Sequence, residues 1–236
     1  MAQTLSLSER WQSLQARIAA ACARAGRDPA EICIVAVSKG VPPDRIADAY
    51  ALGLRDFGEN YWQEARTKLD ALPHDIRWHF IGHLQTNKVK YVVGRFALIQ
   101  VVDRVSLLQE VQRVAQKREL VQPVLIEVRL AEVEGRAGVS FEDAPALIEQ
   151  ALRTDGVELQ GLMGIAPDTD DVRVLRAVFQ RLRRLYETLP APNRHWLSMG
   201  MSHDFEIAIE EGSTMLRLGS ALFGARTQTP YREVDR

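Results

Sequence analysis

The first apolar run of the chain is Ile32-Cys33-Ile34-Val35-Ala36-Val37-Ser38-Lys39, and it decides the fold that we expect. β-Branched residues dominate this run and apolar residues fall on both of its faces, which is typical of a strand buried on both sides in a parallel sheet. Gly40 and the pair Pro42-Pro43 end the strand directly after Lys39. Burial at a strand end favours the neutral form of an amine, and a neutral amine can attack a carbonyl. The alternative is that Lys39 only marks where the strand meets solvent.

Seven further strand-like runs follow, alternating with helical patterns. The expected strands lie at 32–38, at a run ending at 56–60, and at 77–81, 97–102, 123–128, 157–163, 195–198 and 215–218. The expected helices lie at 6–25, 44–51, 62–72, 87–93, 105–118, 143–153, 172–189 and 203–211, with Ser6 or Ser8 capping the first and Asn87 the fourth. This alternation predicts an α/β fold, a single (β/α)8 TIM barrel with an extra N-terminal helix. A doubly wound open sheet is the alternative, since strands are hard to count from one sequence.

The composition restricts the possible partners and the compartment. The chain has 236 residues, 30 Lys and Arg against 31 Asp and Glu, and a net charge of -1, so general attraction to nucleic acid or to an anionic membrane is not expected. It lacks the apolar segments of a signal peptide or a membrane span. Its two cysteines, Cys22 and Cys33, have no metal-ligand spacing, and we expect reduced thiols and no metal site. We therefore expect one cytoplasmic domain over 1–236, with the barrel proper at about 30–226.

Polar residues mark the expected strand ends, where the active sites of barrels lie. They include Lys39, Asn60, His83, Ser198 and Arg217. The loops after the seventh and eighth strands contain Ser198-Met199-Gly200-Met201-Ser202 and Gly219-Ser220, and each enters a helical turn. Glycine, hydroxyl groups and free backbone N–H groups are typical of a phosphate site, and these two loops are its usual place in this fold. Ordinary helix caps are the alternative.

A reactive lysine together with a phosphate site indicates a phosphorylated aldehyde. Pyridoxal 5'-phosphate (PLP) with Lys39 as the imine-forming amine fits, and so does the substrate of a lysine-dependent sugar-phosphate aldolase. Arg217 favours PLP, because its side chain is expected to point into the barrel two residues before the phosphate turn. An arginine is charged and only donates hydrogen bonds, so it would keep a pyridine nitrogen unprotonated. A structural salt bridge is the alternative role for Arg217.

Four motifs resemble the signatures of the pyridoxal phosphate homeostasis protein family, which is related to the barrel domain of alanine racemases. They are Phe57-Gly58-Glu59-Asn60, His79-Phe80-Ile81-Gly82-His83-Leu84-Gln85-Thr86-Asn87-Lys88, Ser198-Met199-Gly200-Met201-Ser202 and Leu216-Arg217-Leu218-Gly219-Ser220-Ala221-Leu222-Phe223-Gly224, and the resemblance covers roughly residues 30–226. Two positions depart from the family pattern. Gly40 stands where the family more often has a hydroxyl or a larger residue, and Arg136 where it often has a lysine.

The resemblance implies a cofactor site built from seven residues. Lys39 would form a covalent aldimine with PLP, Arg217 would face the pyridine nitrogen, and Asn60 would line the pocket. The phosphate would be held by Ser198, Gly219 and Ser220, with assistance from Ser202.

Two functions follow as hypotheses. The resemblance implies a PLP-binding protein of intracellular PLP (vitamin B6) homeostasis, without robust catalytic turnover, with PLP-dependent apo-enzymes as candidate partners. The alternative is a PLP-dependent amino-acid racemase, which needs acid/base groups on both faces of the cofactor. In the barrel racemases the second base is a tyrosine of an added β domain, and we expect none in this chain. For the same reason we expect a monomer.

Overall fold

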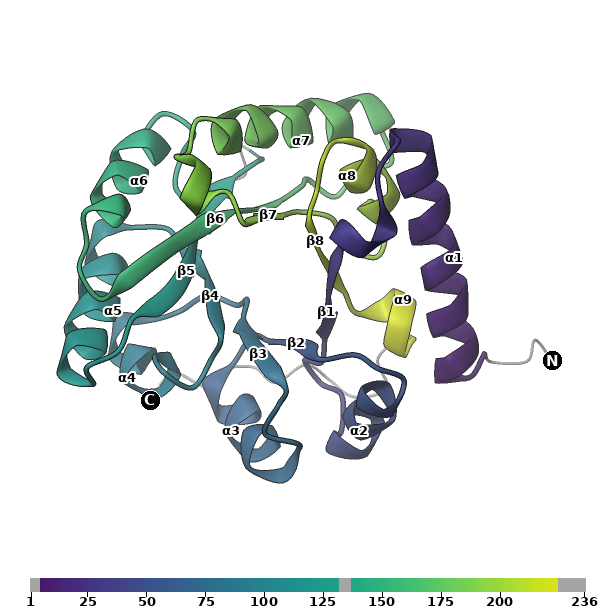
Figure 1. Ribbon diagram of the computed structural model, residues 1–236, viewed down its shortest axis with the longest axis horizontal. Helices are drawn as coiled ribbons and strands as arrows, with labels where there is room; N and C mark the ends of the chain where they lie inside the picture. The colour runs from purple at the N-terminus through teal and green to yellow at the C-terminus, as the bar shows by residue number, and fades with distance from the viewer. Residues whose placement is uncertain (1–4, 132–136, 225–236) are drawn as a thin grey trace.

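The computed structural model describes residues 5–131 and 137–224, so Arg136 lies outside the described residues. Eight parallel strands form a closed barrel in the order β1 to β8, and pairing of β8 with β1 closes the ring. Figure 1 shows this ring with the helices around it. The predicted (β/α)8 barrel is therefore confirmed, and the open sheet is not formed.

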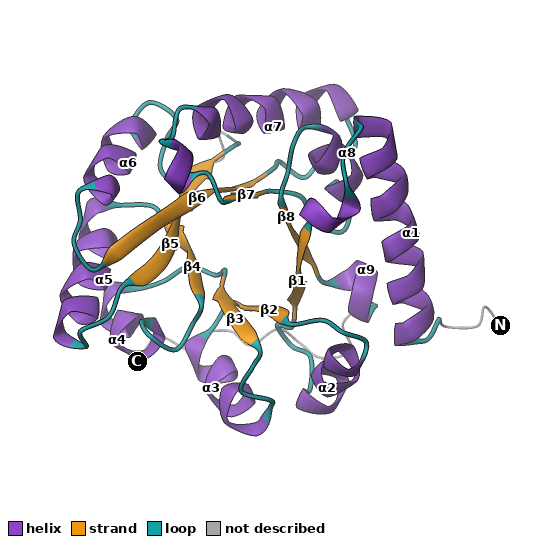
Figure 2. Ribbon diagram, viewed as in Figure 1, coloured by secondary structure: helices purple, strands orange, loops and turns teal. Residues whose placement is uncertain are grey.

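The elements alternate as predicted. The strands are β1 (Cys33–Val37), β2 (Asp56–Glu59), β3 (Arg77–Phe80), β4 (Leu98–Val102), β5 (Gln122–Arg129), β6 (Val157–Ile165), β7 (Trp196–Ser198) and β8 (Met215–Leu218). The helices are α1 (Leu7–Ala25), α2 (Pro43–Ala51), α3 (Trp62–Ala71), α4 (Val89–Val92), α5 (Val105–Lys117), α6 (Ala144–Leu152), α7 (Val172–Glu187), α8 (Phe205–Glu210) and α9 (Ser220–Phe223). Short 3-10 turns lie at Pro29–Glu31, Thr86–Lys88 and Ala191–Asn193. Figure 2 shows the strands as the inner ring and the helices as the outer one.

The strands are buried on both faces, which explains their apolar sequences. Every residue of β2, β4 and β8 is buried, because one side of each strand faces the barrel interior and the other packs under the helices. Polar residues in such strands face a strong penalty unless they are hydrogen-bonded. Gln100, Ser198 and Arg217 are nevertheless buried in β4, β7 and β8, and they therefore mark the part of the barrel that carries chemistry.

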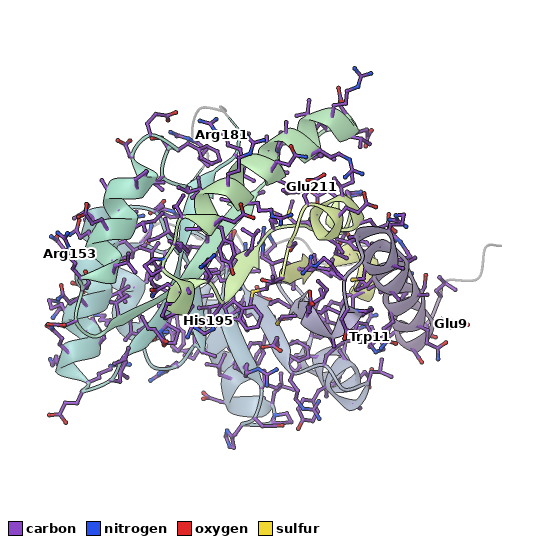
Figure 3. All side chains as sticks on the ribbon, turned by 45° about the horizontal axis from the view of Figure 1, so that its top comes forward. Glu9, Trp11, Arg153, Arg181, His195 and Glu211 are labelled. Carbon is purple, nitrogen blue, oxygen red and sulfur yellow. The ribbon has the colours of Figure 1, made fainter. Side chains whose placement is uncertain are left out.

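The N-terminal helix α1 lies outside the ring, beside α8 and α9 (Figure 1). Ser6 and Glu9 form a reciprocal capping box at its start, and Gly26 ends it in the left-handed conformation. Arg17 pairs with Glu206 and Arg24 with Glu210, so the helix is held to α8 by charge as well as by its apolar face. Figure 3 shows labelled charged side chains such as Arg153 and Arg181 on the outside of the molecule.

Several element boundaries and one helix cap differ from the prediction. Asn87 lies inside the 3-10 turn Thr86–Lys88 and does not cap α4, so that assignment was wrong. The helix expected from residue 203 begins at Phe205, and β6 extends two residues further than predicted, to Ile165. Within residues 5–131 and 137–224, no helix has the length and apolar character needed to cross a membrane.

Candidate functional site

Lys39 lies two residues after the end of β1 and is half-buried, while the preceding Ser38 is fully buried. The strand ends in a tight turn, in which the Val41 N–H donates to the Ser38 carbonyl at 2.9 Å. Gly40 has a φ of +71°, in the left-handed region that favours glycine. The departure from the family pattern at Gly40 thus coincides with a turn that a larger residue would strain.

Arg217 lies in the barrel interior, as predicted. Its Nη1 donates to the Ser198 hydroxyl at 2.6 Å and its Nη2 to the Gly164 carbonyl at 2.9 Å, so it is held from β7 and β6 at once. Burial lowers the pKa of Arg217 to about 10, although Glu127 and Asp204 act in the opposite direction. The guanidinium is therefore still charged at neutral pH and can only donate hydrogen bonds.

A chain of hydrogen bonds continues from Arg217 across the barrel. The Ser198 hydroxyl donates to Gln100 Oε1 at 2.7 Å, and Gln100 Nε2 lies 2.9 Å from His79 Nδ1. His79 Nε2 lies 3.0 Å from Asp56 Oδ1. The chain thus links residues of β8, β7, β4, β3 and β2.

The hydrogen bonds that link Arg217, Ser198, Gln100, His79 and Asp56 all have the same donor-to-acceptor direction. Burial on its own would raise the pKa of Asp56, but the hydrogen bonds from His79 and Arg77 outweigh burial and lower that pKa to about 2. The ionised Asp56 only accepts, so His79 donates from Nε2 and accepts at Nδ1 from the Gln100 amide. Every bond then runs from Arg217 towards Asp56, which fixes the Ser198 hydroxyl and the Gln100 amide in one orientation each.

The loops after β7 and β8 meet, as the prediction of a phosphate site requires. The Ala221 N–H donates to the Ser202 hydroxyl oxygen at 3.1 Å, which ties the first loop to the second. Gly219 and Ser220 lie beside this contact in sequence, and Ser220 is exposed. Within the described residues, neither the Ser220 hydroxyl nor the Ser202 hydroxyl proton has a hydrogen-bonding partner. Both are thus available to a ligand, whereas the Ser198 hydroxyl is engaged by Gln100 and Arg217.

Asn60 is half-buried immediately after β2, and Gly82 of the loop after β3 lies against its backbone. A Cβ atom on Gly82 would lie 2.4 Å from the Asn60 carbonyl oxygen, so only glycine allows this approach. The close contact explains the glycine in the motif around Gly82 and brings the ends of β2 and β3 together. His83, next in the chain, is exposed.

Several polar residues near the site were missed by the sequence analysis. Gln100 is the one polar residue of the buried strand β4, and Glu127 is the one polar residue in the buried segment 124–128 of β5; that contrast was the signal that could have identified them. Burial and the charge of Asp103 raise the pKa of Glu127 to about 7, with Arg217 acting in the opposite direction. His79 is also buried, as a member of this set of hydrogen-bonded side chains.

Comparison with known proteins places this geometry in a family. The model of the alanine racemase N-terminal domain matches residues 10–227. A pyridoxal phosphate homeostasis protein of Aquifex aeolicus is 44% identical over 226 residues, covering 94% of this chain and 99% of the relative. The protein of the same name from Pseudomonas aeruginosa is 40% identical over 227 residues, with 94% and 96% covered.

Solved structures agree with the sequence comparison. PipY of Synechococcus elongatus, solved with PLP bound, is 34% identical with a TM-score of 0.79, covering 93% of this chain and all of PipY (100%). An alanine racemase of Streptomyces lavendulae has a TM-score of 0.68 at 17% identity, covering 90% of this chain and 57% of the racemase, and it shows the fold alone.

Proposed function

The chain belongs to the pyridoxal phosphate homeostasis protein family, and on that premise we propose that it binds PLP at the carboxyl ends of β1, β2, β7 and β8. We further propose that it takes part in intracellular PLP homeostasis without sustained turnover. The relatives carry this function in their names, and PipY has been solved with PLP bound.

The observation that carries the proposal is the buried guanidinium of Arg217. It is held by Ser198 and the Gly164 carbonyl, and it stands on the strand that leads into the loop joined to Ser202. A donor-only cation in the barrel suits an unprotonated ring nitrogen, and the available hydroxyl groups suit a phosphate. A sugar-phosphate aldolase would give Arg217 no comparable partner. The residues present therefore fit PLP.

Each residue has an assigned role in the proposed site. Lys39 supplies the amine for a covalent C=N bond with the cofactor, whose aldehyde and aromatic ring are the chemistry that PLP brings. Asn60 lines the pocket, and Arg217 donates to the ring nitrogen. Ser202, Gly219 and Ser220 hold the phosphate. The hydroxyl of Ser198 would have to leave Gln100 to donate to the phosphate, so we assign Ser198 first to the orientation of Arg217.

All of these residues come from one chain, and we propose a monomer that exchanges PLP with apo-enzymes. Light scattering of the purified protein should then give a mass of about 26.6 kDa. A dimer mass would contradict the monomer without affecting the cofactor site.

Reduction with borohydride tests the covalent attachment. The protein loaded with PLP should absorb in the visible range, and borohydride should leave the cofactor on the peptide containing Lys39. Lys39→Ala should abolish both signals, whereas Lys117→Ala, at an exposed position on α5, should change neither. A labelled peptide containing any other lysine would overturn the assignment of Lys39.

A further inference from the structure

A buried charged cluster contacts the peptide groups on both sides of Lys39. It consists of Glu59 at the end of β2 and of Glu64 and Lys68, which lie one turn apart on α3. The exposed fractions of the side chains are 0% for Glu59, 15% for Glu64 and 4% for Lys68. None of the three has a role in the proposed cofactor site.

Lys68 uses all three of its ammonium protons within this cluster. Its Nζ donates to Glu59 Oε1 at 2.7 Å, to Glu64 Oε1 at 2.5 Å and to the Ser38 carbonyl at 2.8 Å. An ammonium group has three donors, so Lys68 is saturated and fixed in place. One of its partners is the backbone of the residue directly before Lys39.

The two carboxylates hold the same turn from both ends. The Ser38 hydroxyl donates to Glu59 Oε1 at 2.5 Å, and the Gly40 N–H donates to Glu64 Oε1 at 2.6 Å. Three contacts therefore fix the residues before and after Lys39, and the backbone of Lys39 has little freedom to move. The backbone sets the direction in which the Lys39 side chain leaves Cα and restricts its first rotamer.

Removing these charged groups from water costs free energy, and that cost offsets much of the stability that the ion pairs give to the fold. Glu59 Oε2 and Glu64 Oε2 are buried and have no hydrogen-bonding partner within the described parts of the chain. Burial raises the pKa of Glu59 to about 7, with Lys68 opposing and Glu64 reinforcing the change. Apolar side chains of similar volume often give equal or greater stability than a buried ion pair. Stability alone therefore gives no reason for this charged cluster to lie beside Lys39.

We propose that Glu59, Glu64 and Lys68 are positioning residues for Lys39, which hold Ser38 and Gly40 so that the amine is aimed at the carbonyl with which it condenses. In that condensation the C=O bond of the aldehyde breaks as the C=N bond forms, and the oxygen leaves as water with the two protons of the neutral amine. This inference rests on the proposed function, because it needs an aldehyde ligand in the barrel mouth. Small displacements of a reacting group can slow a reaction by about a hundredfold, so the expected effect lies in the rate of the covalent step.

The test compares PLP with pyridoxine 5'-phosphate, which has the same ring and phosphate but an alcohol in place of the aldehyde. The rate of the covalent step is followed by the rise of the visible absorbance, and the affinity for pyridoxine 5'-phosphate by equilibrium dialysis. We expect Lys68→Met to slow the covalent step at least about tenfold and to leave pyridoxine 5'-phosphate affinity within about twofold of wild type.

Glu64 offers a matched pair of variants. Gln at this position keeps an oxygen that can accept from the Gly40 N–H, whereas Leu removes it. We expect Glu64→Leu to slow the covalent step about tenfold and Glu64→Gln to slow it by no more than about threefold. Arg153→Met is the control for loss of an ion pair. Arg153, labelled in Figure 3, pairs with Glu149 at 2.5 Å, but the two side chains are 76% and 62% exposed.

The outcomes distinguish a failure of the positioning role from a failure of the proposed function. If a variant loses pyridoxine 5'-phosphate affinity in proportion to its rate, the cluster only supports the fold and the positioning role is wrong. Unchanged rates also overturn that role. If wild-type protein forms no bond with PLP through Lys39, the proposed function fails instead, and the positioning role fails with it. If Lys68→Met does not fold, the comparison of Glu64→Leu with Glu64→Gln decides.

Discussion

The guanidinium of Arg217 donates a hydrogen bond of 2.6 Å to the hydroxyl of Ser198 inside the barrel. Because that hydroxyl donates in turn to Gln100, it is bound on both sides and has one orientation. Ser198 was predicted as a phosphate ligand from its place at the end of a strand. Because its hydroxyl is engaged by Gln100 and Arg217, we propose that Ser198 orients Arg217, the residue expected to face the ring nitrogen.

Serine variants should separate these two roles. A hydrogen bond to a charged phosphate contributes roughly 1.5–3 kcal/mol of binding free energy. Ser202→Ala and Ser220→Ala should therefore each weaken PLP binding by about tenfold or more. Their affinity for pyridoxal, which has no phosphate, should not change. Ser198→Ala should weaken the binding of both ligands by the same factor, because it disturbs Arg217. Equilibrium dialysis measures both affinities, and a defect of Ser198→Ala confined to PLP would restore Ser198 to the phosphate.

Gln100 should contribute to the stability of the fold through its buried hydrogen bonds to Ser198 and His79. Gln100→Leu removes the acceptor of Ser198 and the donor to His79 while keeping a side chain of similar size. A buried polar group left without a partner costs about 1–3 kcal/mol, so the free energy of unfolding in urea should fall by about that amount. Gln109→Leu, at an exposed position on α5, is the control and should change it by less than about 0.5 kcal/mol. An equal effect of the two substitutions would show that the buried hydrogen bonds of Gln100 do not stabilise the fold.

The fold was predictable because its signals are local. The β-branched run from Ile32 to Ser38 and its seven counterparts alternate with helical patterns, and Gly or Pro ends several of them. These features fix where each strand begins and ends to within a few residues, and the alternation leaves few topologies to choose from. Asn87 was placed wrongly because a residue that can cap a helix is also common in turns, and sequence does not distinguish the two.

The site was only partly predictable, for a different reason. Arg217 could be placed inside the barrel because its strand and the turn that follows it are both recognisable. The chain through Gln100 and His79 could not, since it joins β3, β4 and β7, and the partners depend on how the closed barrel aligns its strands. The contact between Lys68 and the Ser38 carbonyl was equally unpredictable, because nothing in the sequence shows which face of α3 meets the turn after β1.

Glu127 should make stability depend on pH. Burial and Asp103 raise its pKa from 4.5 to about 7 against the effect of Arg217, so the folded state binds a proton over a range in which the unfolded state has released it. Its contribution is fully present below about pH 4.5 and is lost as the pH rises through 7. Glu127→Gln should therefore show a smaller loss of unfolding free energy between pH 5 and 8 than wild type.

Glu59 should account for part of the pH dependence of stability that remains in Glu127→Gln. Burial also raises the pKa of Glu59 to about 7, so Glu127→Gln should reduce the slope without removing it, and the double variant with Glu59→Gln should reduce it further. Asp56 acts in the other direction, since its pKa is lowered to about 2 and its contribution is lost only as the pH falls from 3.8 towards 2. Urea titrations from pH 5 to 8 measure the slopes. Identical slopes for wild type and Glu127→Gln would show that Glu127 is ionised in the folded state.

The last prediction concerns turnover. Racemisation requires acid/base groups on both faces of the cofactor, and Lys39 supplies one. Arg217 is charged at neutral pH and only donates, so it should keep the ring nitrogen unprotonated and weaken the stabilisation of negative charge that amino-acid chemistry needs. Two buried carboxyls interact with Arg217, Glu127 and Asp204, and burial raises the pKa of each. Glu127, whose pKa is raised to about 7, is the first candidate for a second acid or base.

Incubation of the PLP-loaded protein with L-alanine in deuterated water tests this expectation. We expect no formation of D-alanine at enzyme-like rates, which are typically about 1–1000 per second, and at most slow incorporation of deuterium at the α-carbon. Lys39→Ala and Glu127→Gln are the informative variants, because they remove the two candidate acid/base groups one at a time. Rapid formation of D-alanine that is lost in Lys39→Ala would establish the racemase in place of the homeostasis protein, and its loss in Glu127→Gln as well would identify the second base. If wild type and both variants show the same trace of exchange, that exchange belongs to free PLP, and the protein binds the cofactor without using it.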